Sequence, residues 1–211
     1  MKGYIFDMDG TLLDSLDAWV NIGNRYLESL GLAPAPDLDE KLNHMALSDG
    51  SKYVKERFHL KQTTDEIIAG IRNIINNKYA YEIDLKEGVR DFLQECKEKQ
   101  YKMCVLTASD SQLAKKAFQR LGVLEYFEDV YACHEIGLTK KDPQSYIEVA
   151  KKMQLLPQEC TVVEDALYAI KTAKEAGFYV KAIYDKANQH EWDSISKEAD
   201  ESYYTFKDMK I

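Results

Sequence analysis

Two aspartates, Asp7 and Asp9, directly follow a short apolar run at residues 3–6, and Gly10 and Thr11 come immediately behind them. A carboxylate can attack as a nucleophile, carry a proton or bind a metal ion. A solvent-exposed turn is the plainer explanation of an isolated pair of this kind. Here the pair follows an apolar strand and is joined to a Gly-Thr turn. This context favours a catalytic or metal-binding role for the two carboxylates over a solvent-exposed turn.

Polar residues also flank the later apolar segments of the chain. These polar residues are Thr107 and Ser109, with Ala108 between them, after one segment, Lys140 and Lys141 before another, and Glu164 and Asp165 after it. In an open parallel sheet, ligands bind outside the carboxyl ends of the strands. We therefore expect most of these side chains to meet at one edge of such a sheet.

The elements that must position these residues are short β-forming segments at 3–6, 102–106, 161–163 and 179–184, with a weaker one near 130–132. Stretches of helical length separate the later segments. Parallel strands need crossover connections, so this alternation predicts an α/β fold, a Rossmann-like parallel sheet flanked by helices.

A helical block interrupts that alternation between the first and second strands. Its first helix is expected to begin at Asp14-Ser15, which we interpret as capping residues without a chemical role, and to end at Gly31. Its core face would carry Trp19, Tyr26 and Leu30, repeated at helical spacing.

Residues 37–49 lack periodicity and predict a loop, whereas 53–58 and 64–79 have helical patterns. The sequence thus predicts two domains. An α/β core would comprise residues 1–14 and 85–211, and an inserted all-α domain would comprise residues 15–84.

Composition excludes several classes of function. The 211 residues carry a formal net charge of −8, which argues against nucleic-acid binding, and they contain no apolar stretch of membrane-spanning length. Asp7 follows too closely on the start for a secretory signal, which predicts a cytoplasmic protein.

The four cysteines are widely spaced and predict buried free thiols. His44, His59, His134 and His190 lack metal-ligand spacing and predict surface or local packing positions.

Four acids gathered at one edge would repel one another unless a cation lay between them. Magnesium prefers carboxylate oxygens and commonly completes its coordination with water and a substrate phosphate. Lysine, hydroxyl and backbone N–H groups can hold the other phosphate oxygens. The residues therefore predict a Mg²⁺ site beside a phosphate site.

The motifs DMDGTLLDS, VLTAS, KKDPQSY and VVEDALYAIKTAKEAG, in this order, resemble the four signatures of the haloacid dehalogenase superfamily. The helical block matches the cap position of its beta-phosphoglucomutase-like and phosphoglycolate phosphatase-like branch. The resemblance covers essentially the whole chain. It implies a magnesium-dependent phosphatase that acts on a small phosphorylated metabolite through an aspartyl phosphate.

The resemblance also implies roles for individual residues. Asp7 would be the nucleophile and Asp9 the general acid and base. Thr107, the amide of Ala108 and Lys140 would bind the phosphoryl group. Lys141 stands where the signature commonly has proline, which leaves open which lysine faces the site, and Lys140 is favoured by its distance from Pro143. Asp165, helped by Glu164, would complete the metal site with Asp7 and the backbone carbonyl of Asp9.

Two other functions remain open. A beta-phosphoglucomutase would share all four signatures, but mutases of this kind often carry a histidine in the first cap helix, and residues 14–30 contain none. A phosphorylation-dependent signalling module would place its acid pair and its phosphorylated aspartate in a different order along the chain.

The substrate specificity of a cap-bearing phosphatase should lie in the cap, whose closure would exclude water. We expect the loop from Met45 to Lys52 to face the site, with Trp19, Ser48 and Lys52 as candidate substrate contacts. The protein is expected to be a monomer and to need no nucleic-acid or membrane partner.

Overall fold

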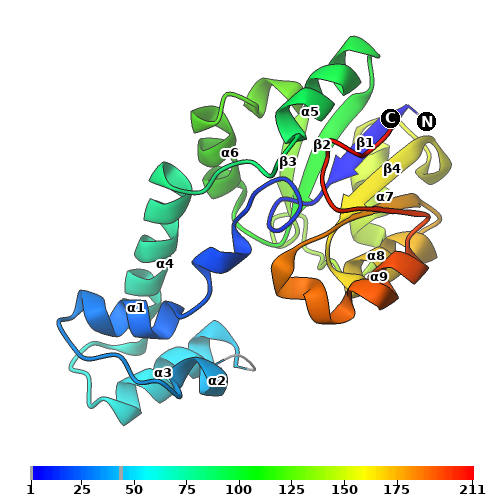
Figure 1. The fold of residues 1–211 in the computed structure, drawn as a ribbon. Coiled ribbons are helices and arrows are strands. Elements are labelled where there is room, and N and C mark those ends of the chain that lie inside the picture. The colour runs from blue at the N-terminus through cyan, green and yellow to red at the C-terminus, as the bar shows by residue number, and fades with distance from the viewer. Residues whose placement is uncertain (1, 43–44) are drawn as a thin grey trace. The chain divides into compact units, whose positions relative to one another are not determined.

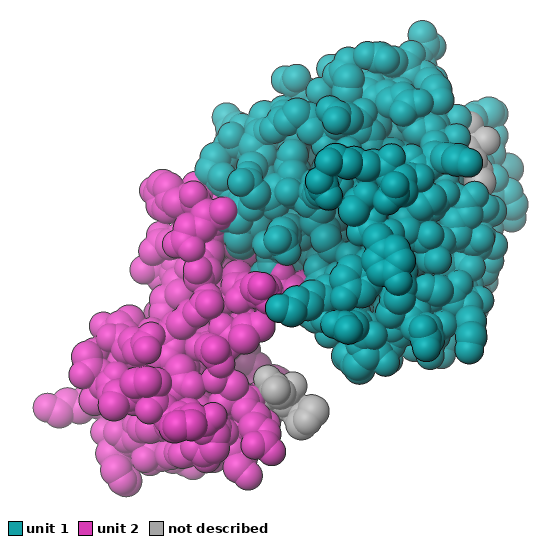
Figure 2. All heavy atoms as spheres, viewed as in Figure 1, with its two compact units in different colours: residues 1–15, 83–211 teal, residues 16–82 magenta. Residues whose placement is uncertain are grey.

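The computed structural model describes residues 2–42 and 45–211. The chain divides into two compact units, one formed by residues 1–15 and 83–211 and the other by residues 16–82 (Figure 2). The expected cap, 15–84, differs from the smaller unit by one or two residues at each end. Among the described residues, no helix has the length and apolar character needed to cross a membrane.

The larger unit is built on one six-stranded sheet in which all neighbouring strands are parallel (Figure 1). The spatial order is β3-β2-β1-β4-β5-β6. The strands are β1 (Gly3–Phe6), β2 (Lys102–Thr107), β3 (Asp129–Ala132), β4 (Cys160–Glu164), β5 (Tyr179–Ile183) and β6 (Glu201–Tyr203). Every residue of β1 is buried because the strand lies between β2 and β4.

Helices cover both faces of this sheet, as expected (Figure 1). The helices of the larger unit are α5 (Val89–Glu98), α6 (Ser111–Arg120), α7 (Pro143–Lys152), α8 (Leu167–Glu175) and α9 (Trp192–Glu198). Ile5 packs in a core with residues of α7, α8 and α9. Tyr4 and Phe6 point to the opposite face, where both rings contact Phe92 of α5.

The smaller unit contains helices only, within its described residues. They are α1 (Ile22–Ser29), α2 (Leu38–Leu42), α3 (Leu47–Arg57) and α4 (Thr64–Tyr81). Thr63 and Glu66 begin α4 with a reciprocal capping box. Two apolar clusters, one around Tyr26 and one around Leu27, consist entirely of residues of this unit. The unit therefore has a hydrophobic core of its own.

Two expectations about local structure were wrong. The first helix does not begin at Asp14-Ser15, because a 3-10 turn at Leu16–Ala18 precedes α1 and leaves Trp19 exposed outside any helix. The segment 37–49 is not one loop, since α2 and the start of α3 lie in it. In addition, residues 201–203, for which no strand was expected, form β6 at the sheet edge, where Lys181 pairs with Glu201.

Two expectations about side chains are confirmed. All four cysteines are buried free thiols. His59, His134 and His190 are exposed, whereas His44 lies outside the described residues.

Candidate functional site

Asp7 is the first residue beyond β1, and its side chain is buried at the carboxyl edge of the sheet. Its backbone N–H donates to the carbonyl of Val163 at 3.0 Å, which extends the pairing of β1 with β4 by one residue. The pKa of Asp7 is raised to about 6, because burial and the charge of Glu164 raise it and the charge of Lys140 only partly opposes them. A carboxylate in this position needs a cationic partner to stay ionised.

Lys140 is that partner. Its ammonium donates to Asp7 Oδ1 and, at 2.6 Å, to Glu164 Oε1, and its side chain is almost fully buried. Burial by itself would lower the pKa of Lys140, but Asp7 and Glu164 raise it well above its usual value. Lys141 is exposed and lies over the ring of Tyr168 instead. The lysine that faces the acids is thus Lys140.

Glu164 is the last residue of β4 and Asp165 follows it, and both side chains are buried. Tyr146 of α7 donates its hydroxyl to Glu164 Oε1 at 3.1 Å. Thr11 donates its hydroxyl to Asp165 Oδ1 at 3.1 Å, and Asn188 donates its side-chain amide to Asp165 Oδ2 at 2.7 Å. These contacts fix the direction in which the Asp165 carboxylate points.

The carboxylates of Asp7, Glu164 and Asp165 converge closely enough to share a metal ion. One oxygen from each lies within 4.8 Å of the others. Burial, together with the charges of Asp7 and Glu164, raises the pKa of Asp165 well above its usual value. Three buried carboxylates exceed what the single ammonium of Lys140 can neutralise, and an all-oxygen donor set suits a hard divalent cation. The residues present therefore fit a metal of that class.

Asp9 lies two residues after Asp7, and its carboxylate accepts hydrogen bonds from two serine hydroxyls. Ser15 donates to Asp9 Oδ1 at 2.7 Å, and Ser109 donates to Asp9 Oδ2 at 2.6 Å. The interpretation of Ser15 as a helix cap was wrong, since its side chain is fully buried against Asp9. Only its place within six residues of Asp9 could have suggested this contact.

Thr107 is the last residue of β2, the strand beside β1, and Ala108 follows it. Thr107 is fully buried, and its hydroxyl accepts the N–H of Ser109 at 3.0 Å. Ala108 is exposed, so this part of the backbone at the carboxyl edge of the sheet is accessible. The structure brings a buried hydroxyl and an accessible turn to the edge that carries Asp7 and Asp9.

Trp19, Ser48 and Lys52 belong to the smaller unit, and all three are exposed. Ser48 and Lys52 lie on α3, so the expected substrate-facing loop from Met45 to Lys52 is largely helical. A role in substrate binding stays a prediction for all three residues.

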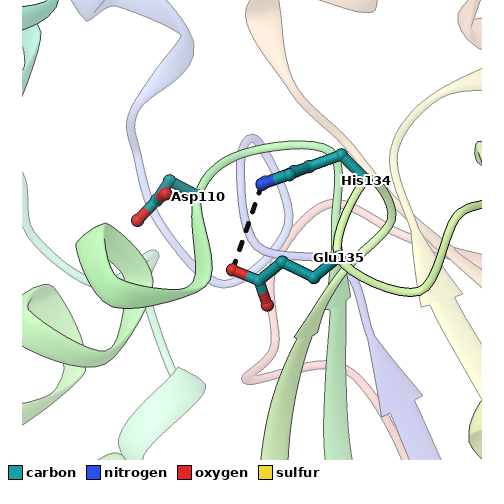
Figure 3. Close-up of side chains that lie close together, drawn as sticks. All are labelled: Asp110, His134 and Glu135. Atoms are coloured by element: carbon teal, nitrogen blue, oxygen red, sulfur yellow. Dashed lines mark ion pairs between the residues drawn. The ribbon is translucent and has the colours of Figure 1, made fainter.

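A second group of potential metal ligands, Asp110, His134 and Glu135, lies in the loops after β2 and β3 (Figure 3). His134 Nε2 is 4.0 Å from Glu135 Oε1. All three residues are exposed, and both acids have structural partners: Asp110 caps α6 through Leu113 N–H, and Glu135 accepts the Ser111 hydroxyl at 2.6 Å. We assign these residues no metal.

Sequence reasoning missed Lys86, Asp185 and Asn188, which are joined to the site by side-chain hydrogen bonds. They stand outside the four signature motifs. Their residue types have no spacing that would have singled them out.

The sequence model of the haloacid dehalogenase-like hydrolases matches residues 4–183. A phosphorylated carbohydrates phosphatase of Thermotoga maritima is 25% identical over 184 residues, which cover 87% of this chain and 84% of that protein. A fructose-1-phosphate phosphatase of Escherichia coli is 27% identical, with 83% and 92% covered.

Among solved structures, a candidate beta-phosphoglucomutase of Thermotoga maritima superposes with a TM-score of 0.85. It is 22% identical, and the match covers 96% of this chain and 94% of that one. This likeness shows the same fold.

Proposed function

The chain belongs to the haloacid dehalogenase-like hydrolase family, and we propose that it is a magnesium-dependent phosphatase of small phosphorylated metabolites, with phosphorylated sugars as the first substrates to test. The observation that carries this proposal is the buried group of Asp7, Lys140, Glu164 and Asp165, next to the serine-bound Asp9. The two relatives named as sugar phosphatases support the choice of substrate class.

Asp7 is the proposed nucleophile. One of its carboxylate oxygens attacks phosphorus, and the bond between phosphorus and the leaving oxygen breaks, which gives an aspartyl phosphate. Lys140 contacts Asp7 and would also offset charge on the transferring phosphoryl oxygens. The hydroxyl of Thr107 and the amide of Ala108 would bind the same oxygens.

Asp9 is the proposed proton carrier. In the first step it gives its proton to the leaving alkoxide, and in the second it takes a proton from the water that attacks phosphorus. The bond from phosphorus to Asp7 then breaks, and inorganic phosphate leaves. Ser15 and Ser109 hold the two oxygens of Asp9 and so fix its direction.

Asp7, Asp165 and Glu164, with the backbone carbonyl of Asp9, would hold Mg²⁺. When bound, the ion would offset the negative charge of the carboxylates and of the substrate phosphate. These three side chains would hold the cation while one oxygen of Asp7 stays free to attack the substrate.

The smaller unit, residues 16–82, is proposed to be the cap that selects the substrate, with Trp19, Ser48 and Lys52 as candidate contacts. A mutase of the same family is the alternative function. Hydrolysis is favoured because residues 14–30 contain no histidine that would limit loss of the phosphoryl group to water.

Phosphate release from sugar phosphates, nucleotides and phosphoglycolate, with and without Mg²⁺, tests the function. Wild type should turn over at least one sugar phosphate with Mg²⁺, and Asp7→Asn should not. Asp14→Asn is the matched control, because Asp14 is exposed and carries no proposed role.

Turnover by Asp7→Asn, or by wild type with excess chelator, would contradict the mechanism. Sustained isomerisation of a hexose phosphate in place of phosphate release would favour the mutase.

A further inference from the structure

Lys86 lies where the chain returns from the smaller unit to the larger one, and its ammonium has a full set of acceptors. It donates to the carbonyl of Gly10 at 2.7 Å, to the carbonyl of Tyr184 at 2.6 Å and to Asp185 Oδ2 at 2.8 Å. The Lys86 side chain is 14% exposed and that of Asp185 is 6% exposed. An ammonium has three protons to donate, so this lysine is fully satisfied.

The contact with Gly10 reaches the turn that carries the proposed catalytic residues. Gly10 has a φ of +80°, and its N–H donates to the carbonyl of Leu13 at 3.0 Å. Asp9 precedes this glycine and Thr11 follows it. A donor fixed on the Gly10 carbonyl therefore limits rotation of the peptide group that joins Gly10 to Thr11.

Asp185 extends the same network toward the acids. Its Oδ1 accepts the N–H of Ala187 at 2.8 Å, and its carbonyl accepts the N–H of Asn188 at 3.1 Å. These bonds begin a 3-10 helix at Lys186–Glu191. That short helix places the Asn188 amide 2.7 Å from Asp165 Oδ2 and 3.3 Å from the Asp165 carbonyl.

We propose that Lys86 and Asn188 are positioning residues, which hold the Gly10 turn and the Asp165 carboxylate through the partly buried Lys86–Asp185 ion pair. This inference rests on the proposed function, since it says what those held groups are for. Some residues do not bind a metal themselves but orient the side chains that do. Their replacement typically lowers the affinity for the metal, or the activity, by about 10 to 100-fold.

Asn188→Ala tests the first half of the proposal, because Asn188 is neutral and partly exposed and its loss should spare the fold. We expect kcat for p-nitrophenyl phosphate to fall, and the Mg²⁺ concentration for half-maximal rate to rise, by about tenfold or more. Mg²⁺ binding without substrate, measured by calorimetry, should weaken likewise. Gln189→Ala, an exposed amide on the same short helix, should match wild type in all three measurements.

Lys86→Met alone would leave Asp185 buried without its cation, so the variant could fail through misfolding. The double variant Lys86→Met with Asp185→Asn avoids this, because it removes both charges and still lacks the donor to Gly10. If the pair only stabilises the fold, the double variant should melt at a lower temperature than wild type, while the folded protein should turn over like wild type. The positioning role predicts the same melting temperature with kcat at least about tenfold lower.

Wild-type rates and Mg²⁺ affinity in Asn188→Ala, or wild-type kcat in the folded double variant, would overturn the inference. Failure of the proposed function looks different, because wild type itself would then neither bind Mg²⁺ nor release phosphate.

Discussion

The carboxylate of Asp9 accepts hydroxyls from two parts of the chain, Ser15 at 2.7 Å and Ser109 at 2.6 Å. Ser15 lies six residues beyond Asp9, and Ser109 follows β2. Both hydroxyls can donate to the ionised form of Asp9, and either can turn to accept a hydrogen bond from the O–H of the neutral form. Such partners suit a group that alternates between the two forms.

At this scale we expect Ser15→Ala and Ser109→Ala each to lower kcat by about tenfold, the equivalent of one hydrogen bond to a charged group. The double variant should lose more than either single variant, while the melting temperature changes little. Phosphate release at saturating substrate measures the effect, and the exposed Ser194→Ala is the control. Wild-type kcat in both single variants would show that the serines do not direct Asp9.

At the scale of elements, the start of α5 depends on one glycine. Gly88 caps the helix with a φ of +85°, and a Cβ added there would lie 2.5 Å from the backbone nitrogen of Lys207 and 2.9 Å from the carbonyl carbon of Phe206. The C-terminal segment therefore packs directly on the beginning of α5. A side chain at this position faces both an unfavourable backbone conformation and a collision with main chain.

We expect Gly88→Ala to lower the free energy of unfolding by about 3 kcal/mol or more, since backbone strain and displacement of the 206–207 main chain add together. Gly137→Ala is the matched control. Gly137 has a φ of +72° with open space around it, so its replacement by alanine should lower the free energy of unfolding by only about 1 kcal/mol. Urea unfolding measures both, and equal losses would contradict the close approach of residues 206–207.

At the scale of the whole molecule, each unit has an apolar core of its own. The cluster around Ile5 lies wholly within the larger unit, and the clusters around Tyr26 and Leu27 lie wholly within the smaller one. The two chain segments that join the units are held together, because Asp14 N–H donates to the Asp84 carbonyl at 3.0 Å.

Replacement of residues 16–82 by a short Gly/Ser linker should therefore leave a folded larger unit. We expect an α/β circular dichroism spectrum and one cooperative thermal transition, since the sheet, its helices and its core all remain. A spectrum without a cooperative transition would show that the sheet depends on the smaller unit. If that unit is the cap, the shortened protein should also lose its preference among phosphate esters.

Much of the fold and of the site could be predicted from the sequence, for a physical reason. A fully apolar β1 must be buried, and the residue that follows it must stand at the sheet edge, which placed Asp7. The same reasoning placed Thr107 and Asp165. It missed β6, because an edge strand of three partly exposed residues has little apolar pattern to recognise.

The sequence by itself determined the family, the parallel sheet and the acids that end its strands, because periodicity and motif order are local properties. Only the tertiary structure decided that Lys140 faces Asp7, that Ser15 binds Asp9 and that Lys86 joins Gly10 to Asp185. Lys86 is 76 residues from Gly10 and 99 from Asp185. Contacts of this kind depend on strand register and side-chain direction, which the packed core fixes and no short stretch of sequence encodes.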